Sequence, residues 1–228
     1  EIEDILVLKN NKGTEDNRVR KLDYSIQITK LFYERFIKNA EISLFSPNNV
    51  PGLYEAFGMP EFDDLYIKYE KDKSVPRSTV GAQELFMDLL KERAETGRIY
   101  IMNLDHCNTH SSFKDKVYMS NLCQEITLPT TPVQHIDDKE GEIALCILSA
   151  INLGLLSDMD ELEELCDLSV RALDEIIDYQ EYPVEAAKIS TQARRSLGIG
   201  YIGLAHYLAK NQVGYEDKKA LKLVDKVT

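Results

Sequence analysis

The chain has 228 residues, of which 43% are hydrophobic and 29% charged, the composition of a folded globular protein rather than a disordered one. Its formal net charge of −12, from 27 basic and 39 acidic side chains, argues against a protein that binds the phosphate backbone of nucleic acid. No run of residues approaches the roughly 20 apolar residues of a membrane span, so we expect no membrane anchor. The start shows no basic region followed by an apolar one, so we expect no signal peptide.

Four cysteines, Cys107, Cys123, Cys146 and Cys166, form neither a Cys-x-x-Cys pair nor a closely spaced framework. This usage does not indicate a secreted protein stabilised by disulfides. We therefore expect a reducing compartment, the cytoplasm, in which each thiol has to be explained by packing or by chemistry.

The first third of the chain predicts a short apolar segment followed by helices. Residues 5–8 indicate a short strand or apolar segment that runs into a turn. Asp23 is placed to cap a helix whose apolar side chains follow at helical spacing. Two prolines and a glycine within 46–52 are typical of a turn, and short helices are expected near 53–57 and 61–69.

The middle of the chain predicts a loop, a helix and a strand. The charged segment 68–78 is expected to be an exposed loop, and apolar spacing predicts a helix over about 79–96 that ends at Gly97. Residues 98–104 are rich in β-branched and aromatic side chains and predict a strand. The polar segment 105–119 is expected to be irregular.

The last third predicts a buried strand and two long helices. The run 142–151 is apolar on both faces, which is typical of a buried strand. An amphipathic helix is expected over 158–179, with Cys166 on its apolar face and so in the core. Residues 183–208 are expected to be helical with a glycine interruption. The alternation of strands and helices indicates the α/β class.

The glycine interruption, Gly198-Ile199-Gly200-Tyr201-Ile202-Gly203, has the spacing of a phosphate-binding glycine loop. That loop requires a strand before it and a helix after it. Because we expect a helical context on both sides, close helix packing is the preferred interpretation of these glycines.

The segment Ser120-Asn121-Leu122-Cys123-Gln124-Glu125-Ile126 places an amide, a thiol and a carboxylate two residues apart. In an extended segment these three side chains share one face, each within about 7 Å of its neighbour, so that a potential general base lies beside the thiol. The spacing alone favours a half-buried edge strand with an inert cysteine. Pro129 and Pro132 soon afterwards favour a loop or finger over a long strand.

Two other kinds of site remain open from the residues themselves. Cys123 could be the nucleophile of a Cys-His hydrolase with His106, His110 or His135 as base, although no helix N-terminus is expected beside the thiol to lower its pKa. His106, Cys107 and His110 could bind a metal if they lay on one helix. Their polar surroundings favour a loop, and no second ligand pair has zinc-like spacing, so we expect no metal.

Two cysteine motifs together carry a resemblance to a known family. Residues 120–126 are followed by Gly141-Glu142-Ile143-Ala144-Leu145-Cys146 and by Leu148-Ser149-Ala150-Ile151-Asn152-Leu153-Gly154, and the combination resembles the large, catalytic subunit of class I ribonucleotide reductase. The resemblance covers essentially the whole chain. Asn-Leu-Cys-x-Glu, in place of the Asn-Pro-Cys-Gly-Glu of cobalamin-dependent relatives, favours class I. Further similar segments are Leu44-Phe45-Ser46-Pro47, Pro51-Gly52-Leu53-Tyr54, Thr96-Gly97-Arg98-Ile99-Tyr100, Asp105-His106-Cys107-Asn108 and Arg195-Ser196-Leu197-Gly198-Ile199-Gly200.

The resemblance implies a role for each chemical group. Cys123 matches the cysteine at the tip of the family's finger loop, which becomes a transient thiyl radical and abstracts the 3′ hydrogen of the ribose. Glu125 matches the carboxylate that takes the proton of the 3′-hydroxyl, and Asn121 matches an amide that hydrogen-bonds to the ribose hydroxyls. Cys146 matches one of two cysteines that reduce the 2′ position and end as a disulfide. We expect Leu122 to line the substrate site with them.

The implied fold is a ten-stranded α/β barrel with a finger loop through its centre. We therefore expect 1–228 to be part of the catalytic barrel domain, with the finger loop at about 119–133. The N-terminal regulatory region, the strand with the partner of Cys146 and the main effector loops would precede residue 1. The phosphate-binding segment, the relay tyrosines, the tail cysteines and the C-terminal part of the barrel would follow residue 228. The start Glu1-Ile2-Glu3, without a methionine, fits a fragment that is inactive alone.

The implied function is reduction of ribonucleoside diphosphates to deoxyribonucleoside diphosphates by thiyl radical chemistry, which supplies DNA replication. The implied partners are the substrate, the remaining segments of the large subunit, a small radical-generating subunit that carries the metal, and thioredoxin or glutaredoxin as reductant. ATP and dNTP effectors would bind mainly outside this segment, and no cofactor is expected within it. Two alternatives stay open, a non-catalytic assembly fragment of the same subunit and a Cys-dependent hydrolase.

Overall fold

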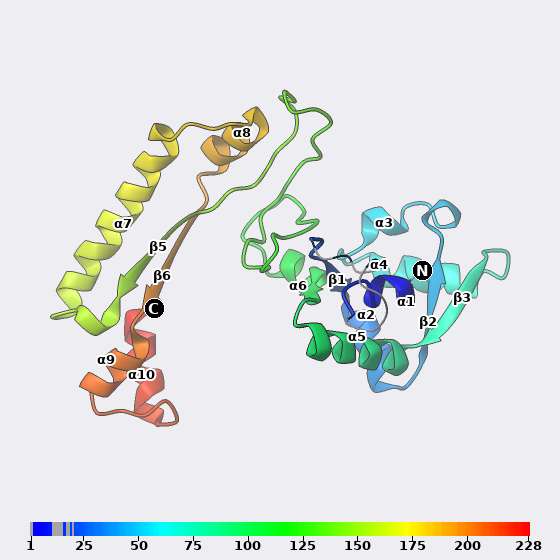
Figure 1. The fold of residues 1–228 in the computed structure, drawn as a ribbon, viewed down its shortest axis with the longest axis horizontal. Helices are drawn as coiled ribbons and strands as arrows, with labels where there is room; N and C mark the ends of the chain where they lie inside the picture. The colour runs from blue at the N-terminus through cyan, green and yellow to red at the C-terminus, as the bar shows by residue number, and fades with distance from the viewer. Residues whose placement is uncertain (1, 11–15, 17–18, 20) are drawn as a thin grey trace. The chain divides into compact units, whose positions relative to one another are not determined.

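The computed structural model describes residues 2–10, 16, 19 and 21–228. The chain divides into two compact units, the first ending at Pro129 and the second running from Thr130 to Thr228 (Figure 1). Strands and helices alternate in both units, so the predicted α/β class is confirmed. None of the helices in the described part of the chain is long and apolar enough to cross a membrane.

The first unit contains two sheets with helices packed around them. Strands β1 and β4 pair in parallel from Ser25↔Tyr100 to Ile28↔Asn103, and β2 and β3 pair antiparallel from Glu41↔Gly81 to Phe45↔Arg77. In chain order its elements are α1 (Ile2–Leu6), β1 (Ser25–Ile28), α2 (Lys30–Ile37), β2 (Glu41–Phe45), the 3-10 turn η2 (Pro47–Asn49), α3 (Leu53–Ala56), α4 (Phe62–Lys71), β3 (Arg77–Gly81), α5 (Ala82–Thr96), β4 (Tyr100–Asn103) and α6 (Leu104–Thr109).

The hydrophobic clusters of this unit lie between its strands and helices. One cluster joins α1, β1 and α5 through Leu6, Ile28 and Leu89, and a second surrounds Phe62 and Tyr66 of α4. The burial of these apolar side chains stabilises the unit, because apolar surface removed from water contributes roughly 25 cal/mol per Å².

The helix expected from Asp23 begins later than the apolar spacing indicates. Residues 25–28 form β1, and the helix begins only at Lys30. Asp23 does not cap it and instead pairs with Lys9, with 2.8 Å between the Lys9 Nζ and a carboxylate oxygen. Pairing with β4, a partner distant in sequence, decides the conformation here, and local spacing cannot register that partner.

The helix expected over 79–96 begins at Ala82, because Arg77–Gly81 form β3 and pair with β2. Gly97 ends this helix in the left-handed conformation, as predicted. The exposed loop expected over 68–78 is shorter than predicted, since α4 continues to Lys71. The short helices expected near 53–57 and 61–69 are confirmed as α3 and α4.

Two polar or short segments of the first unit are helical where other structure was expected. The apolar residues near the start form α1 and a following turn, not a strand. Leu104–Thr109 form α6, inside the segment expected to be irregular. Leu104 is only 2% exposed, so burial of an apolar side chain holds this short helix despite its polar composition.

The second unit is built on a two-stranded parallel sheet. Strands β5 and β6 pair from Ile147↔Leu197 to Asn152↔Ile202, and α7 packs along both strands (Figure 1). In chain order its elements are β5 (Ile147–Asn152), the 3-10 turn η3 (Leu153–Leu155), α7 (Met159–Tyr179), α8 (Glu185–Arg194), β6 (Leu197–Ile202), α9 (Leu204–Lys210) and α10 (Lys218–Val227). The predicted 158–179 helix is therefore confirmed.

Two predictions for the second unit are wrong. The segment expected to be helical over 183–208 is helix, strand and helix, so its glycines lie in and after β6. The strand within 142–151 is β5, and it is not buried on both faces, since Leu148 is 62% exposed. Because α7 packs against one face of a two-stranded sheet, alternate residues of the strand stay exposed.

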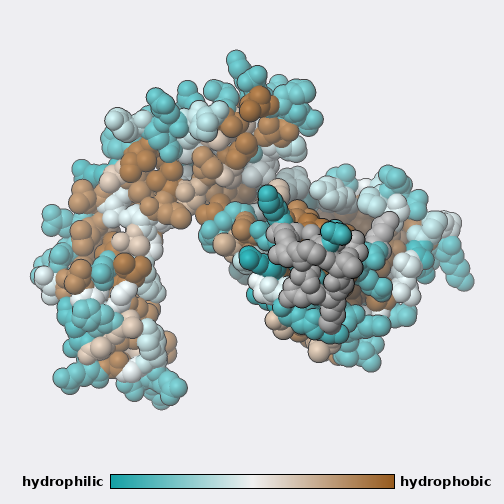
Figure 2. Space-filling view, viewed as in Figure 1, coloured by the Kyte–Doolittle hydropathy of each residue, from teal (hydrophilic) through white to brown (hydrophobic). Residues whose placement is uncertain are grey.

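Exposed apolar side chains mark the surface of the second unit, and Figure 2 shows hydrophobic residues gathered there. Tyr201 and Ile202 of β6 are 42% and 55% exposed. Within the described residues the strands form three separate two-stranded sheets, and no closed barrel is present among them.

Candidate active site

The segment that carries the amide, the thiol and the carboxylate forms a tight turn rather than an extended strand. The Gln124 N–H donates to the Asn121 carbonyl over 3.1 Å, which closes a four-residue β-turn. Gln124 has a φ of 63°, in the left-handed region. A turn breaks the alternation of side chains, so the prediction that Asn121, Cys123 and Glu125 share one face of a strand is wrong. The loop that the following prolines predict is what forms.

Side-chain hydrogen bonds close the neck of this loop. Asn121 Oδ1 accepts a hydrogen bond from the Ile126 N–H at 3.0 Å, and the Ser120 hydroxyl donates to the Ile126 carbonyl at 2.7 Å. Both backbone polar groups of Ile126 are thereby satisfied without a neighbouring strand. Asparagine and serine offer the backbone such local partners in competition with strand pairing, which explains why periodicity failed here.

The tip of the loop is exposed. Asn121, Cys123 and Glu125 are all exposed, and Leu122 is 51% exposed. Since the Asn121 oxygen already accepts within the loop, the part of its amide that can serve a ligand is the nitrogen, a donor. The loop therefore presents a thiol, a carboxylate and an amide donor within five consecutive residues.

Cys146 lies directly before β5 in the second unit and is half-buried. A Cβ added to Gly198 would lie 3.1 Å from the Cys146 sulfur and 2.5 Å from Leu148 Cδ2, so β6 can pass this close only because residue 198 is a glycine. Burial raises the pKa of the Cys146 thiol. Burial thus favours the protonated thiol over the thiolate.

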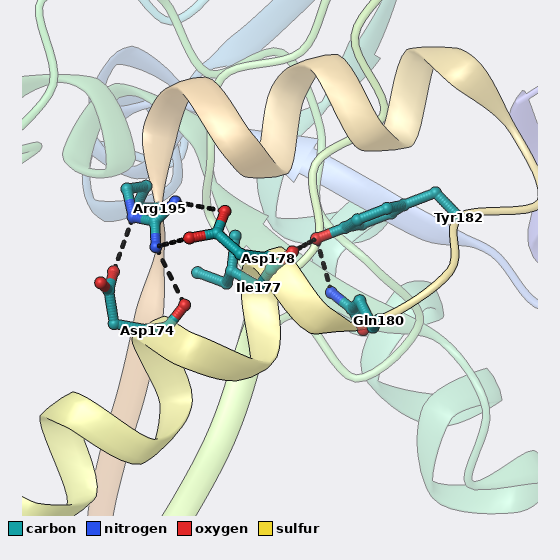
Figure 3. Close-up of polar contacts among 6 residues, drawn as sticks. All are labelled: Asp174, Ile177, Asp178, Gln180, Tyr182 and Arg195. Atoms are coloured by element: carbon teal, nitrogen blue, oxygen red, sulfur yellow. Dashed lines mark hydrogen bonds and ion pairs between the residues drawn. The ribbon is translucent and has the colours of Figure 1, made fainter.

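An arginine holds the start of β6 against the end of α7. Figure 3 shows Arg195 between Asp174 and Asp178, with its Nε 2.6 Å from an Asp174 carboxylate oxygen and two nitrogens 3.0 Å from the Asp178 oxygens. A fourth bond joins Arg195 to the Asp174 carbonyl at 2.9 Å. The guanidinium holds the pKa of Asp174 below its usual range.

Arg195 itself has a φ of 47°, in the left-handed region, where the chain leaves α8 for β6. The C-terminal end of α7 is also held by Tyr182, whose hydroxyl donates to the Ile177 carbonyl at 2.7 Å and accepts from Gln180 at 2.6 Å (Figure 3). These contacts fix the strand that carries Gly198, and so the surroundings of Cys146.

The glycines of β6 do not form a phosphate loop. Gly198 and Gly200 lie inside the strand, opposite Leu148 and Ala150. Gly203 has a φ of 74° before α9, and an added Cβ there would collide with the Asn152 side chain. Close packing explains Gly198 and Gly203, but it is packing of a strand and a turn, so the expected helix packing is wrong.

The geometry does not favour a Cys-His hydrolase. Among the described residues no histidine hydrogen-bonds to Cys123, and the cysteine lies in a turn rather than at the start of a helix. His110 instead contacts Thr109 and the His106 carbonyl.

The residues considered for a metal site lie on α6 or at its C-cap, which is His110. His106 and His110 do share a face of this helix, with ring centroids 5.7 Å apart, although a loop was expected. In the described part of the chain no group of three or more His, Cys, Asp or Glu side chains could hold a metal ion. Cys107 is half-buried in an apolar cluster with Leu104 and Val117.

Cys166 is exposed on α7, so its expected place in the core is wrong. Leu162, Leu173 and Ile177 of this helix are buried, whereas Cys166, at helical spacing from them, is exposed.

Comparison with known proteins finds the same family over the whole chain. Residues 1–228 match the family described as "Ribonucleotide reductase, barrel domain". The chain is 60% identical over 225 residues to the ribonucleoside-diphosphate reductase subunit alpha of Haemophilus influenzae, a match that covers 96% of this chain.

Two further relatives show how widely the similarity extends. The ribonucleoside-diphosphate reductase 1 subunit alpha of Escherichia coli is 56% identical over 99% of this chain, and the ribonucleoside-diphosphate reductase subunit alpha of phage T4 is 43% identical over 97% of it. In all three cases the chain spans about 30% of the length of the relative.

Proposed function

This chain belongs to the ribonucleotide reductase family, and from that premise we propose that it supplies part of the active site that reduces ribonucleoside diphosphates to deoxyribonucleoside diphosphates. The observation that carries the proposal is the loop 120–126, which presents an exposed thiol and an exposed carboxylate on a closed turn in the family's Asn-Leu-Cys-x-Glu context.

In this proposal the loop performs the first chemical step. As a thiyl radical, Cys123 takes the hydrogen atom from the ribose 3′ carbon, so that an S–H bond forms and the C–H bond breaks. Glu125 accepts the proton of the 3′-hydroxyl, which a carboxylate positioned nearby can do as a general base. The Asn121 amide nitrogen donates to a ribose hydroxyl, and Leu122 lines the same face of the substrate. Cys123 later returns its hydrogen to the 3′ carbon.

The reduction itself is assigned to Cys146 and a second thiol. Replacement of the 2′-hydroxyl by hydrogen releases water and needs two electrons and two hydrogens, which two thiols provide when they form one disulfide. The raised pKa of Cys146 supports this role, because a protonated thiol still carries the hydrogen that the step consumes. The second thiol is assigned to another segment of the subunit, since Cys107 and Cys166 lie outside the family's cysteine motifs.

The remaining parts of the enzyme are assigned to other segments and subunits. We place residues 1–228 in a ten-stranded barrel, with 119–133 as its finger loop, completed by the other two thirds of the subunit. Those segments would hold the regulatory region, the ATP and dNTP effector sites and the phosphate site. A small subunit would carry the metal that generates the radical, and thioredoxin or glutaredoxin would reduce the disulfide. The four free thiols support a cytoplasmic location.

A reconstitution experiment tests this function. The chain is mixed with chains that carry the rest of the subunit, a radical-generating subunit and a dithiol, and deoxyribonucleoside diphosphate is measured. We expect activity only in the complete mixture. Cys123→Ser and Cys146→Ser should abolish turnover, and Glu125→Gln should lower it by about 10²- to 10⁴-fold, the usual contribution of general base catalysis.

Cys166→Ser is the matched control, because this cysteine is exposed on α7 and outside both motifs. It should leave turnover unchanged. Turnover by Cys123→Ser, or by the 228-residue chain alone, would contradict the proposal. An inactive complete mixture would favour a non-catalytic assembly piece, and labelling of Cys123 by acyl electrophiles with hydrolysis of an ester would favour a hydrolase.

A further inference from the structure

Three consecutive residues just before the active-site loop are each held by a different element of the first unit. The Lys116 ammonium donates to the Glu55 carbonyl in α3 at 2.6 Å. Val117 is bound by the side chain of Asn108 in α6. The carbonyl of the next residue, Tyr118, accepts from Gln27 in β1 at 2.6 Å. No strand pairs with residues 116–118 among those described, so these side chains take the place of a strand neighbour.

Asn108 makes the central contact of the three. Its Oδ1 accepts from the Val117 N–H at 2.8 Å, and its Nδ2 donates to the Val117 carbonyl at 3.1 Å. One amide therefore satisfies both backbone polar groups of a residue that is 0% exposed. Because such groups are costly to leave unpaired when buried, this contact strongly selects one position for the chain.

The position of Asn108 is itself restricted. Its Nδ2 also donates to the Leu104 carbonyl one helical turn earlier, at 3.1 Å. A Cβ added to Gly58 would lie 2.6 Å from Leu104 Cγ and 3.3 Å from Asn108 Nδ2, so α6 packs directly onto the backbone before α4. The contact between Asn108 and Val117, which we call the clamp, is thus anchored to the core of the unit rather than to the surface.

We propose that Asn108 is a positioning residue that fixes the point from which the loop carrying Cys123 leaves the core of the first unit. Lys116 and Gln27 support it on either side. Only residues 118–122 separate the clamped Val117 from Cys123, and the neck at Ser120 and Ile126 closes part of that length. A thiol that exchanges a hydrogen atom with a sugar has to be held in place, since a misplacement of about 1 Å can cost about 100-fold in rate.

The proposal rests on the function assigned to Cys123, and three measurements test it. Amide hydrogen exchange at Val117 reports the clamp in the 228-residue chain. A second measurement places spin labels on Cys123 and on a cysteine introduced by Lys91→Cys, at an exposed position of α5, with the other cysteines changed to serine. The width of the distance distribution between the labels reports how firmly the loop is held. The kcat and KM of the reconstituted mixture report the catalytic consequence.

For Asn108→Ala we expect exchange at Val117 to rise about tenfold, the loss of one hydrogen bond. The distance distribution should broaden, and kcat should fall at least tenfold while KM for the nucleotide changes less than about threefold. Asn108→Asp keeps an oxygen that accepts from the Val117 N–H, so it should retain most of the protection of that amide against exchange. Its kcat should lie between those of the wild type and of Asn108→Ala. This graded result separates positioning from a general loss of folding.

Asn211→Ala is the matched control, because Asn211 Nδ2 makes the same helical bond, to the Tyr207 carbonyl at 2.9 Å, without any clamp. It should leave all three measurements unchanged. Unchanged exchange at Val117 in Asn108→Ala would overturn the clamp, and an unbroadened distance distribution or an unchanged kcat would overturn its positioning role. If the wild-type mixture were inactive, the proposed function would fail, while the first two measurements would still decide the clamp.

Discussion

At the scale of the residue, single side chains repeatedly satisfy both backbone polar groups of a distant residue. Asn108 does this for Val117, and the Tyr66 hydroxyl does it for Ser43, donating to its carbonyl and accepting from its N–H at 2.7 Å each. The loss of such a contact is strongly destabilising, because it leaves a buried donor or acceptor without a partner. These contacts satisfy backbone groups that no neighbouring strand satisfies.

Tyr66→Phe should lower the free energy of unfolding by about 1–3 kcal/mol, since the Ser43 groups lose their partner. Burial raises the pKa of Tyr66 to about 12. The folded state thus favours the neutral phenol, and its stabilisation is complete below the ordinary tyrosine pKa and lost as pH rises toward 12. Denaturant unfolding at several pH values should show a larger alkaline loss in the wild type than in Tyr66→Phe, which keeps only the contribution of other buried tyrosines such as Tyr24 and Tyr33. Tyr54→Phe, at a tyrosine that is 72% exposed, is the control and should change neither quantity.

Alanine substitutions at the two glycines inside β6 should have opposite effects on stability. In Gly198→Ala the new Cβ meets Leu148 and the Cys146 sulfur, so we expect a loss of about 1–3 kcal/mol from overpacking and a changed alkylation rate of Cys146. In Gly200→Ala the Cβ meets nothing within 4 Å, and alanine in a strand is about 0.5–1 kcal/mol better than glycine. Chemical denaturation and thiol labelling measure both. Equal effects of the two changes would contradict the close approach at Gly198.

At the scale of the element, α7 organises the second unit. Asp158 caps its start, accepting from the Glu161 N–H at 2.9 Å, while the Glu161 carboxylate accepts from the Ser157 N–H at 2.6 Å. At its other end Arg195 places a positive charge against the last turn, where the helix dipole is negative. The helix packs along β5 and β6, and so sets the strand pair beside Cys146.

Asp158→Ala should reduce the stability of the second unit by about 1 kcal/mol, the usual value of an N-cap side chain. Asp160→Ala removes the same charge from the same helical turn but no capping bond, so its effect should be a few tenths of a kcal/mol. Thermal unfolding followed by circular dichroism compares them. An Asp160 variant as destabilised as the Asp158 variant would mean that charge, not the capping bond, holds this helix end.

At the scale of the whole molecule, the four thiols are free and differ in their surroundings. Cys123 and Cys166 are exposed, whereas Cys107 and Cys146 are half-buried. Burial raises the pKa of both half-buried thiols, and nearby Asp105 raises that of Cys107 further. Since the thiolate is the reactive form, a raised pKa slows alkylation at neutral pH.

Thiol titration of the folded chain should therefore give two fast and two slow equivalents, and four fast ones in denaturant. The rates of the slow pair should still be rising with pH above the ordinary thiol pKa, because their own pKa values lie higher. Cys166→Ser should remove one fast equivalent and leave the slow pair unchanged. Four equal rates in the folded chain would contradict the described burial of Cys107 and Cys146.

The local patterns of the sequence determined the parts of this fold that depend on near neighbours. Apolar spacing was enough for α7, and Gly97 was enough to mark the end of α5. The two cysteine motifs also identified the family and the candidate residues Asn121, Cys123, Glu125 and Cys146, because residue types in a fixed order carry chemistry even when their geometry is unknown.

Only the tertiary structure decided where distant partners replace local preference. Strands β1 and β6 and the end of β3 form in segments expected to be helical, because each strand gains backbone hydrogen bonds from a strand far along the chain. The prolines after Cys123 favoured a loop, but the tight turn that this loop makes rests on side chains, rather than a strand, that satisfy its backbone. The clamp at Asn108 and the space left by Gly198 depend on contacts across 9 and 52 residues, and spacing within a short window contains no information about either.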